Sequence, residues 1–174
     1  MAVPTTAPTG REVHFEPDEV IVSKTDVKGV ITYANRVFLS IAGYTEAEVI
    51  GQPHNMIRHP DMPRSVFQLL WDTVADGREI FAYVVNMAKN GDHYWVFAHV
   101  TPTFDDGGRI VGYHSNRRVP DRRAVATVEQ LYRELCAIER QHSQRKDGIQ
   151  AGMDALKSKL QSAGATYDEL VWSL

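Results

Sequence analysis

"EIFAYVVNMAKNGDHYWVFAHVTPTF", residues 79–104, is the stretch of sequence that decides the fold. Aromatic and β-branched residues dominate both halves, and Asn90-Gly91 lies between them. This dipeptide is the strongest short-range indication of a turn between antiparallel strands. We therefore predict two long strands paired as a hairpin. "DDGG" at 105–108 favours a further turn, so we expect "RIVGYHSNRRV" at 109–119 to form a third strand.

The residues before this hairpin predict two more strands and a group of short helices. "VIVSKTDVKGVITYAN" at 20–35 has two β-branched runs around a turn, while "RVFLSIAG" at 36–43 and "TEAEV" at 45–49 have helical starts and stops. "RSVFQLLWDTVADG" at 64–77 has the apolar spacing of a longer helix. This order predicts an α+β fold, with a five-stranded antiparallel sheet, short helices on one face and the first two strands at its centre.

The composition is that of an ordinary globular chain. It has 174 residues, 43% of them hydrophobic, and a formal net charge of −3, so nothing indicates attraction to nucleic acid or anionic lipid. The single cysteine, Cys136, cannot form an internal disulfide and is a poor start for a zinc site. No window resembles a signal peptide or a membrane helix. We therefore expect a cytoplasmic chain without direct membrane insertion.

"GQPHNMIRHPDMP" at 51–63 is the most unusual connector in the chain. It contains two His, one Arg, one Asp and three Pro, and it has neither helical nor strand periodicity. Connecting loops are usually short and contain few ionisable side chains. A loop stiffened by prolines and rich in ionisable side chains is therefore a candidate wall of a ligand-binding pocket. A turn-rich surface loop explains the same residues equally well.

The apolar residues beyond Pro120 recur at helical spacing, which predicts two helices with a break between them. The first seam comprises Ala124, Val128, Leu131, Leu135 and Ile138, and the second comprises Ile149, Met153, Leu156 and Leu160. A seam this narrow can pair with a second chain or pack against the chain's own sheet, and the sequence leaves both open.

Two motifs, "GYTEAEVIGQPHNMIRHPDMP" at 43–63 and "KNGDHYW" at 89–95, resemble the PAS domain of bacterial aerotaxis receptors. The resemblance runs from about Val20 to Arg118. It implies a PAS fold whose pocket holds FAD non-covalently, with a redox state that reports oxygen or electron-transport status. It therefore implies a redox sensor in signal transduction, not an enzyme.

The resemblance also implies the residues that surround the cofactor. It places Arg58, His59 and Asp61 on the helical side of the pocket, Asn35 beside them, Trp71 on the following helix and Asn86 on the sheet. An Asn amide suits the pyrimidine edge of a flavin because it both donates and accepts hydrogen bonds. An Arg can form paired bonds with a pyrophosphate or with a reduced, anionic flavin.

Each assignment has a structural alternative. Asn35 could simply cap a helix, Trp71 could be core, and Asp61 could only pair with Arg58. Asn86 alternates with Ile80, Ala82 and Val84, so an inward face would bury its amide and require a partner.

The last strand and residue 80 depart from the family pattern. His114 and Asn116 replace apolar residues, and if they face inward they add polar contacts to the ligand. Ile80 stands where the family commonly has Trp, which weakens the case for the same ring packing.

Two other functions compete with the flavin sensor. One is a haem-based gas sensor with His59, His93, His99 or His114 as axial ligand, and the other is a protein-interaction module without a cofactor. Photoadduct chemistry is disfavoured because it needs a thiol beside the flavin, and Cys136 lies in the trailing helical segment. No nucleophile–base pair or metal-ligand cluster has usable spacing, so an enzyme is not expected.

We predict three parts of the chain and one route of output. Residues 1–17 are a flexible leader, 18–120 the PAS sensor domain and 121–174 a helical output and dimerisation segment. The helices are expected to act in a homodimer or on a separate receptor or signalling protein, of the chemotaxis type or another.

Overall fold

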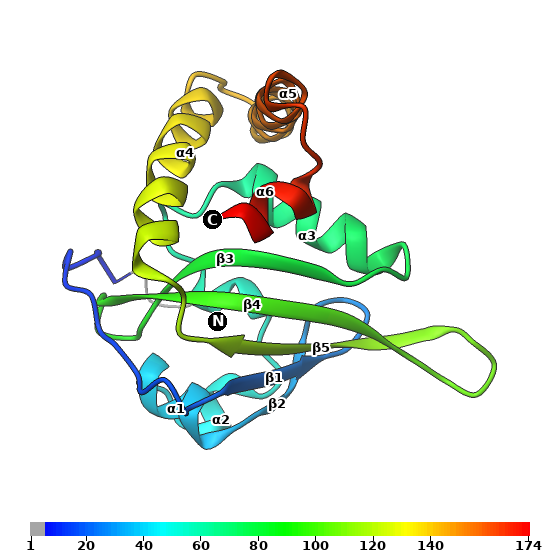
Figure 1. Cartoon of the computed structure of the whole chain (residues 1–174). Helices are drawn as coiled ribbons and strands as arrows, with labels where there is room; N and C mark the ends of the chain where they lie inside the picture. Colours follow the sequence, from blue (N-terminus) through cyan, green and yellow to red (C-terminus); the bar gives the residue numbers. More distant parts are fainter. Residues whose placement is uncertain (1–5) are drawn as a thin grey trace.

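One five-stranded antiparallel sheet forms the centre of the computed structural model, which describes residues 6–174 (Figure 1). The strands are β1 (Ile21–Thr25), β2 (Ile31–Ala34), β3 (Ile80–Met87), β4 (His93–Phe104) and β5 (Ile110–Arg118). Their order is β2-β1-β5-β4-β3, so the α+β prediction is confirmed. The prediction that the first two strands are central is wrong. β5 is central because it pairs with β1 on one side and β4 on the other, which leaves β2 at an edge.

The β3–β4 hairpin turns where the sequence predicted it. Ala88 N–H donates to the Asp92 carbonyl at 2.8 Å, so three residues form the loop rather than two. Gly91 has a φ of 91°, and a Cβ there would lie 2.3 Å from the Ala7 carbonyl oxygen. A glycine is therefore needed at this position both for its backbone conformation and for the close approach of the N-terminal segment.

Four short helical elements lie between β2 and β3: the three predicted helices and, within residues 51–63, a 3₁₀ helix that was not predicted. They are α1 (Arg36–Ala42), α2 (Glu46–Val49), the 3₁₀ helix η1 (His54–Ile57) and α3 (Arg64–Ala75). Asn35 caps α1 and Gly43 ends it in the left-handed conformation, while Thr45 and Glu48 form a capping box at the start of α2. These four elements lie on one side of the sheet, which we call the inner face.

The C-terminal third forms three helices that fold back on the rest of the chain (Figure 1). They are α4 (Arg122–Arg140), α5 (Arg145–Ala163) and α6 (Tyr167–Ser173). The Tyr132 hydroxyl on α4 donates to the Tyr83 carbonyl at 2.6 Å, and the Trp172 ring on α6 lies 4.7 Å from the Phe81 ring. α4 and α6 thus cover the other side of the sheet, the outer face.

The two predicted helices and the break between them are confirmed, and the apolar seam of α4 packs within the chain. Val128 and Leu135 are buried, which supports the alternative that this seam packs on its own domain. α6 was not predicted. No helix in the described part of the chain is long and apolar enough to cross a membrane.

Glu139 on α4 joins the C-terminal helices to the start of α3. Its carboxylate accepts hydrogen bonds from Arg64 N at 3.0 Å, from Ser65 N at 2.8 Å and from the Ser65 hydroxyl at 2.6 Å. A carboxylate is favourable at a helix N-terminus, where backbone N–H groups lack partners. Gly152 on α5 approaches closely, since a Cβ there would lie 2.7 Å from the Ser65 hydroxyl oxygen.

The N-terminal segment differs from the flexible leader that the composition predicted. Residues 6–15 lie along the β3–β4 hairpin, where Glu12 forms a parallel bridge with His93 and Arg11 pairs with Asp92. Glu12 also pairs with Arg122 of α4 at 2.6 Å. The prediction is therefore wrong for this part of the leader, and residues 1–5 lie outside the described residues.

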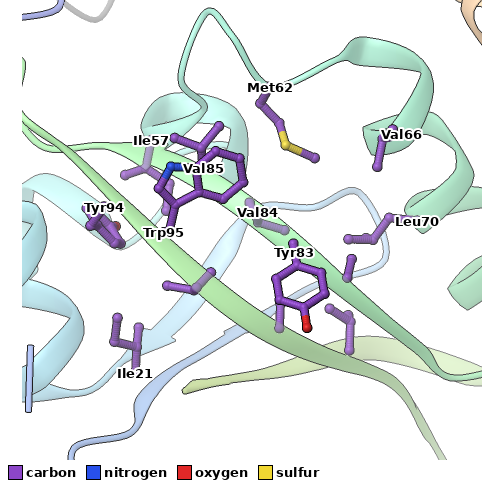
Figure 2. Close-up of a cluster of buried hydrophobic side chains, with 14 of the residues drawn as sticks. Ile21, Ile57, Met62, Val66, Leu70, Tyr83, Val84, Val85, Tyr94 and Trp95 are labelled. Atoms are coloured by element: carbon purple, nitrogen blue, oxygen red, sulfur yellow. The ribbon is translucent and has the colours of Figure 1, made fainter. Parts of the chain in front are cut away.

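The hydrophobic core lies on both faces of the sheet, and Figure 2 shows part of it. Val84 and Leu70 belong to the inner side, whereas Tyr83, Val85 and Trp95 belong to the outer side. Because side chains alternate along β3, Asn86 shares a face with Val84, as the strand periodicity predicted, and this is the inner face, as the family resemblance implied.

Candidate cofactor site

A narrow cavity lies between α3 and the inner face of the sheet. Its volume is about 40 Å³ for the centres of water-sized molecules, several times what a single water needs. A slot shaped for a flat aromatic ring has a small volume on this measure. Such a ring is only slightly thicker than a water molecule, so the centre of a water has little room to move across the slot. The walls are apolar on two sides, formed by Phe67, Leu70 and Trp71 of α3 and by Val84, Ala98 and Val100 of the sheet.

The rest of the cavity wall is polar and incompletely paired. Among the described residues, four buried polar atoms that line this cavity lack a hydrogen-bond partner: Thr25 Oγ1, Asn86 Nδ2, Ser115 Oγ and Arg117 Nη1. Unpaired buried polar groups cost about 1–3 kcal/mol each, so folded proteins rarely retain them without a reason. All four can donate a hydrogen bond, so the complementary ligand is a flat group that carries several acceptors.

Arg117 is the most unusual of these groups. Its side chain is only 3% exposed, and Nη2 donates to the Ser23 hydroxyl at 2.6 Å and to His54 Nε2 at 2.7 Å. No carboxylate in the described part of the chain pairs with it. Burial lowers the pKa of Arg117 to about 10, so the group is still positive at neutral pH. The cavity thus holds a buried cation without an anion.

His54 is a neutral acceptor for this cation. Burial and the neighbouring Arg117 lower the pKa of His54 to about 3. Because Nε2 accepts the bond from Arg117, the ring proton belongs on Nδ1. The connector at 51–63 therefore contributes to the site through His54, which was not among the predicted cofactor-binding residues.

We expect the pH dependence of stability to report this histidine. Between about pH 6.5 and pH 3 the unfolded chain takes up a proton that folded His54 excludes, so its contribution to the free energy of unfolding falls as the pH falls. At pH 4 the loss should be on the order of 3 kcal/mol relative to pH 7. Urea unfolding of the parent and of His54→Gln at both pH values measures it.

The glutamine variant is a suitable reference because its amide oxygen can accept the Arg117 bond and does not titrate. Its loss of stability between pH 7 and pH 4 should be smaller than that of the parent, since only the titrating groups that the two proteins share contribute, such as carboxylates and the other histidines. Equal losses in the two proteins would contradict the neutral state of His54 in the folded protein.

Two predicted site residues line the cavity. Asn86 is 2% exposed and presents an unpaired amide nitrogen, whereas Trp71 is partly buried with its ring 5.4 Å from that of Tyr113. Trp71 also meets the turn before β2, since a Cβ on Gly29 would lie 3.3 Å from its ring. Trp71 thus belongs to both the core and the cavity wall.

Arg58 lies at the entrance rather than in the cavity. Its backbone forms an isolated bridge with Asn86, and its Nη1 donates to the Met62 carbonyl at 2.9 Å. This places the start of the "RHPDMP" sequence at the edge of β3, where the chain passes from the inner to the outer side of the sheet.

His59 and Asp61 lie beyond this edge, and their assignment to the cavity is wrong. The His59 ring lies 5.5 Å from that of His93, in a hollow that Tyr132 of α4 also lines. Asp61 accepts a bond from Arg140 of α4 at 3.1 Å, not from Arg58. The sequence could not indicate this, because the partners belong to a helix distant in the chain.

Asn35 has a structural role instead of a cavity position. Its side-chain oxygen accepts from Val22 N and Phe38 N, both at 3.0 Å, and its nitrogen donates to the Val20 carbonyl at 2.8 Å. The structural alternative raised from the sequence therefore holds for this residue, and it has little capacity left for a ligand.

His114 and Asn116 lie on the outer face, so the condition under which they were expected to contact the ligand is not met, and they do not line the cavity. The Asn116 amide is 3.4 Å from His99 Nδ1, and the His99 ring stacks on Phe81 at 4.2 Å. The alternating residues Tyr113, Ser115 and Arg117 face the cavity in their place.

The entrance to the cavity is strongly basic. It shares His54, Phe67 and Trp71 with the cavity, has a volume of about 200 Å³ on the same measure, and carries four cations. These are Lys28, Arg58, Arg64 and Arg145, and no Asp or Glu of the described chain lines the entrance with them. A groove of about 840 Å³, which contains Tyr44, Met56 and Met62, continues from the same arginines.

The described histidines do not favour a haem site. His54 is the one histidine of the described chain that lines the cavity, and its Nε2 is taken by Arg117. The four candidates from the sequence lie elsewhere. Within residues 6–174, no group of three or more His, Cys, Asp or Glu side chains could hold a metal ion. Cys136 lies on α4 and does not line the cavity.

Comparison with known proteins relates the chain to a large family. The family model described as the PAS fold matches residues 31–117. The chain is 45% identical over 129 residues to the aerotaxis receptor of Escherichia coli, which covers 74% of this chain and 25% of the receptor. It is 30% identical over 118 residues to the nitrogen fixation regulatory protein of Klebsiella pneumoniae, and this match covers 68% of this chain and 23% of the regulatory protein. The chain thus spans about a quarter of the length of these relatives.

Solved structures show the same fold. The dark structure of the blue-light photoreceptor Aureochrome1 LOV matches with a TM-score of 0.56 at 24% identity, covering 66% of this chain and 86% of that one. A light-oxygen-voltage domain studied with a flavin analogue matches with a TM-score of 0.56 at 21% identity, and this match covers 66% of this chain and 87% of that one. At this level of identity the likeness concerns the fold alone.

Proposed function

Because the chain belongs to the PAS fold family and is related to the aerotaxis receptor, we propose that it is a redox sensor that binds FAD non-covalently between α3 and the inner face of the sheet. The observation that carries this proposal is the set of four unpaired donors around an apolar slot. An isoalloxazine ring matches that set, because it is flat, apolar at one end and lined with acceptors at the other.

The apolar and polar halves of the cavity suit the two ends of a flavin. Phe67 and Leu70 oppose Val84 and Ala98 across the slot, which leaves room for a flat ring between helix and sheet. Ile80 is 2% exposed and does not line the cavity, so the lack of a Trp at this position alters the core more than the ligand wall.

A bound flavin would supply reversible electron transfer. The chain's part is to hold it and to respond to its charge. Arg117 provides a buried positive charge that favours the more negative form of the ligand, and Asn86 can present either its amide nitrogen or its amide oxygen. An exchange of these two atoms would change the contacts of β3.

The basic entrance supports a phosphate-bearing flavin over riboflavin. None of its four cations forms an ion pair within the described chain, and a pyrophosphate would pair with them. The adjoining groove of about 840 Å³, with Tyr44 and Met56 in its lining, offers room for the adenosine part of a longer ligand and favours FAD over FMN.

The proposed output runs through the C-terminal helices. α3 lines the cavity, and Glu139 of α4 holds the first residues of α3, so a change in the slot reaches α4 directly. We propose that α4–α6 pass this change to a second copy of the chain or to a chemotaxis-type receptor or other signalling protein in the cytoplasm. The proposed role is sensing, not turnover of a substrate.

Absorption spectroscopy tests the proposal. The purified protein is mixed with excess FAD, desalted and scanned, and a flavin spectrum that changes reversibly with dithionite and air is expected. A haem spectrum from the cells, or no retained chromophore after reconstitution, would contradict it. The second outcome would favour an interaction module without a cofactor.

A further inference from the structure

We propose that Arg145, at the start of α5, is part of the cofactor site and binds the phosphate of the flavin. This rests on the proposed function, since it concerns the entrance to the same cavity. Its consequence is that a phosphate-bearing flavin holds α5 against the sensor domain, whereas the same ring without phosphate does not.

The first step is the position of Arg145. α5 begins at this residue, and both Arg145 and Ile149, one turn later, line the entrance with Arg58, Arg64 and Trp71. Trp71, Phe67 and His54 also line the ring cavity, so the entrance and the cavity adjoin at these three side chains. A helix outside the region matched by the family model therefore supplies part of the wall.

The second step is the charge. Burial and the positive charges of Arg64 and Arg145 lower the pKa of Arg58, and Glu139 opposes this only in part. The Glu139 carboxylate is already occupied by the N-terminus of α3. Within the described chain, none of the four entrance cations forms an ion pair. An anion of two or more negative charges would relieve their repulsion.

The third step is the coupling to α5. Gly148 and Gly152 bring this helix close to α4 and α3, since a Cβ at Gly148 would lie 2.6 Å from the Glu139 carbonyl oxygen. A ligand that binds more tightly while α5 is docked stabilises the docked position of this helix. By linkage, undocking of α5 lowers the affinity for the ligand by the same factor by which the ligand favours docking. Cofactor occupancy and the position of the output helix are then linked.

The test compares three flavins on two variants. Arg145→Gln should bind FAD and FMN about 10-fold more weakly than the parent by fluorescence titration, with riboflavin affinity unchanged. Lys146→Gln is the matched control, because Lys146 is exposed on the same turn and does not line the entrance. Unchanged FAD and FMN affinity in Arg145→Gln, while riboflavin still binds, would overturn this inference and leave the proposed function standing.

Hydrogen exchange gives a second readout. In the parent protein, FAD should slow amide exchange in α5 more than riboflavin does, and this difference should disappear in Arg145→Gln. Equal protection of α5 by the two ligands in the parent would overturn the coupling. If none of the three flavins binds the parent, the proposed function fails together with this inference.

Discussion

Arg117→Met should weaken FAD binding by roughly 10- to 150-fold, the equivalent of one lost charge-assisted hydrogen bond. The folded protein without cofactor should change much less, by under about 1 kcal/mol in the free energy of unfolding. Removing a buried cation that has no anion relieves a desolvation cost, and this relief offsets the loss of the bonds to Ser23 and His54. The reduction potential of the remaining bound flavin should fall, because reduction adds negative charge beside the missing cation.

Titration with FAD, urea unfolding and a redox titration measure the three effects. Arg118→Met is the matched control, because Arg118 is the next residue of β5 and is exposed. It should leave all three quantities near the parental values. A variant at position 117 that binds FAD as tightly as the parent would show that the buried cation serves the fold alone.

Asn86→Ala should reduce FAD affinity by roughly 5- to 150-fold, which corresponds to about 1–3 kcal/mol for polar flavin atoms left without a partner. The amide is 2% exposed and its nitrogen is unpaired, so its removal costs the protein without cofactor no hydrogen bond from this nitrogen. Binding should therefore fall more than stability does. Fluorescence titration with FAD and urea unfolding, carried out side by side, check this split.

Asn116→Ala is the matched control for this prediction. It removes the same side chain from the neighbouring part of the sheet, but on the outer face beside His99. It should leave FAD affinity within about a factor of two, as expected for a position away from the ligand. If Asn116→Ala weakens binding as much as Asn86→Ala does, the ligand does not lie on the inner face.

The local elements could be predicted because their causes are local. Asn90-Gly91 determines a tight turn through backbone conformation, Asn35 and Thr45 cap their helices, and the alternation along β3 places Asn86 with Val84. These features depend on residues within a few positions of one another. The pattern placed Asn86 on the same face as Val84, which the structure confirms, and the structure shows that this face is the inner one.

The face of β5 could not be decided in the same way. His114 and Asn116 alternate with Ser115 and Arg117 along the strand, and both sets are polar. Strand periodicity identifies two faces but does not say which is inner when neither is apolar. The pairing of β5 between β1 and β4 decided it, and put Arg117 beside Ser23 and His54.

The sequence by itself determined the α+β class, the hairpin and the helices before and after it, because periodicity, caps and turn residues act over short distances. It also determined the family resemblance, through the motifs at 43–63 and 89–95. Tertiary structure alone decided that β5 is central, that His59 and Asp61 face α4, and that Arg117 is buried without an anion. It also brought Arg145 to the entrance of the cavity. Each of these depends on contacts between residues far apart in the chain, and no local pattern carries that information.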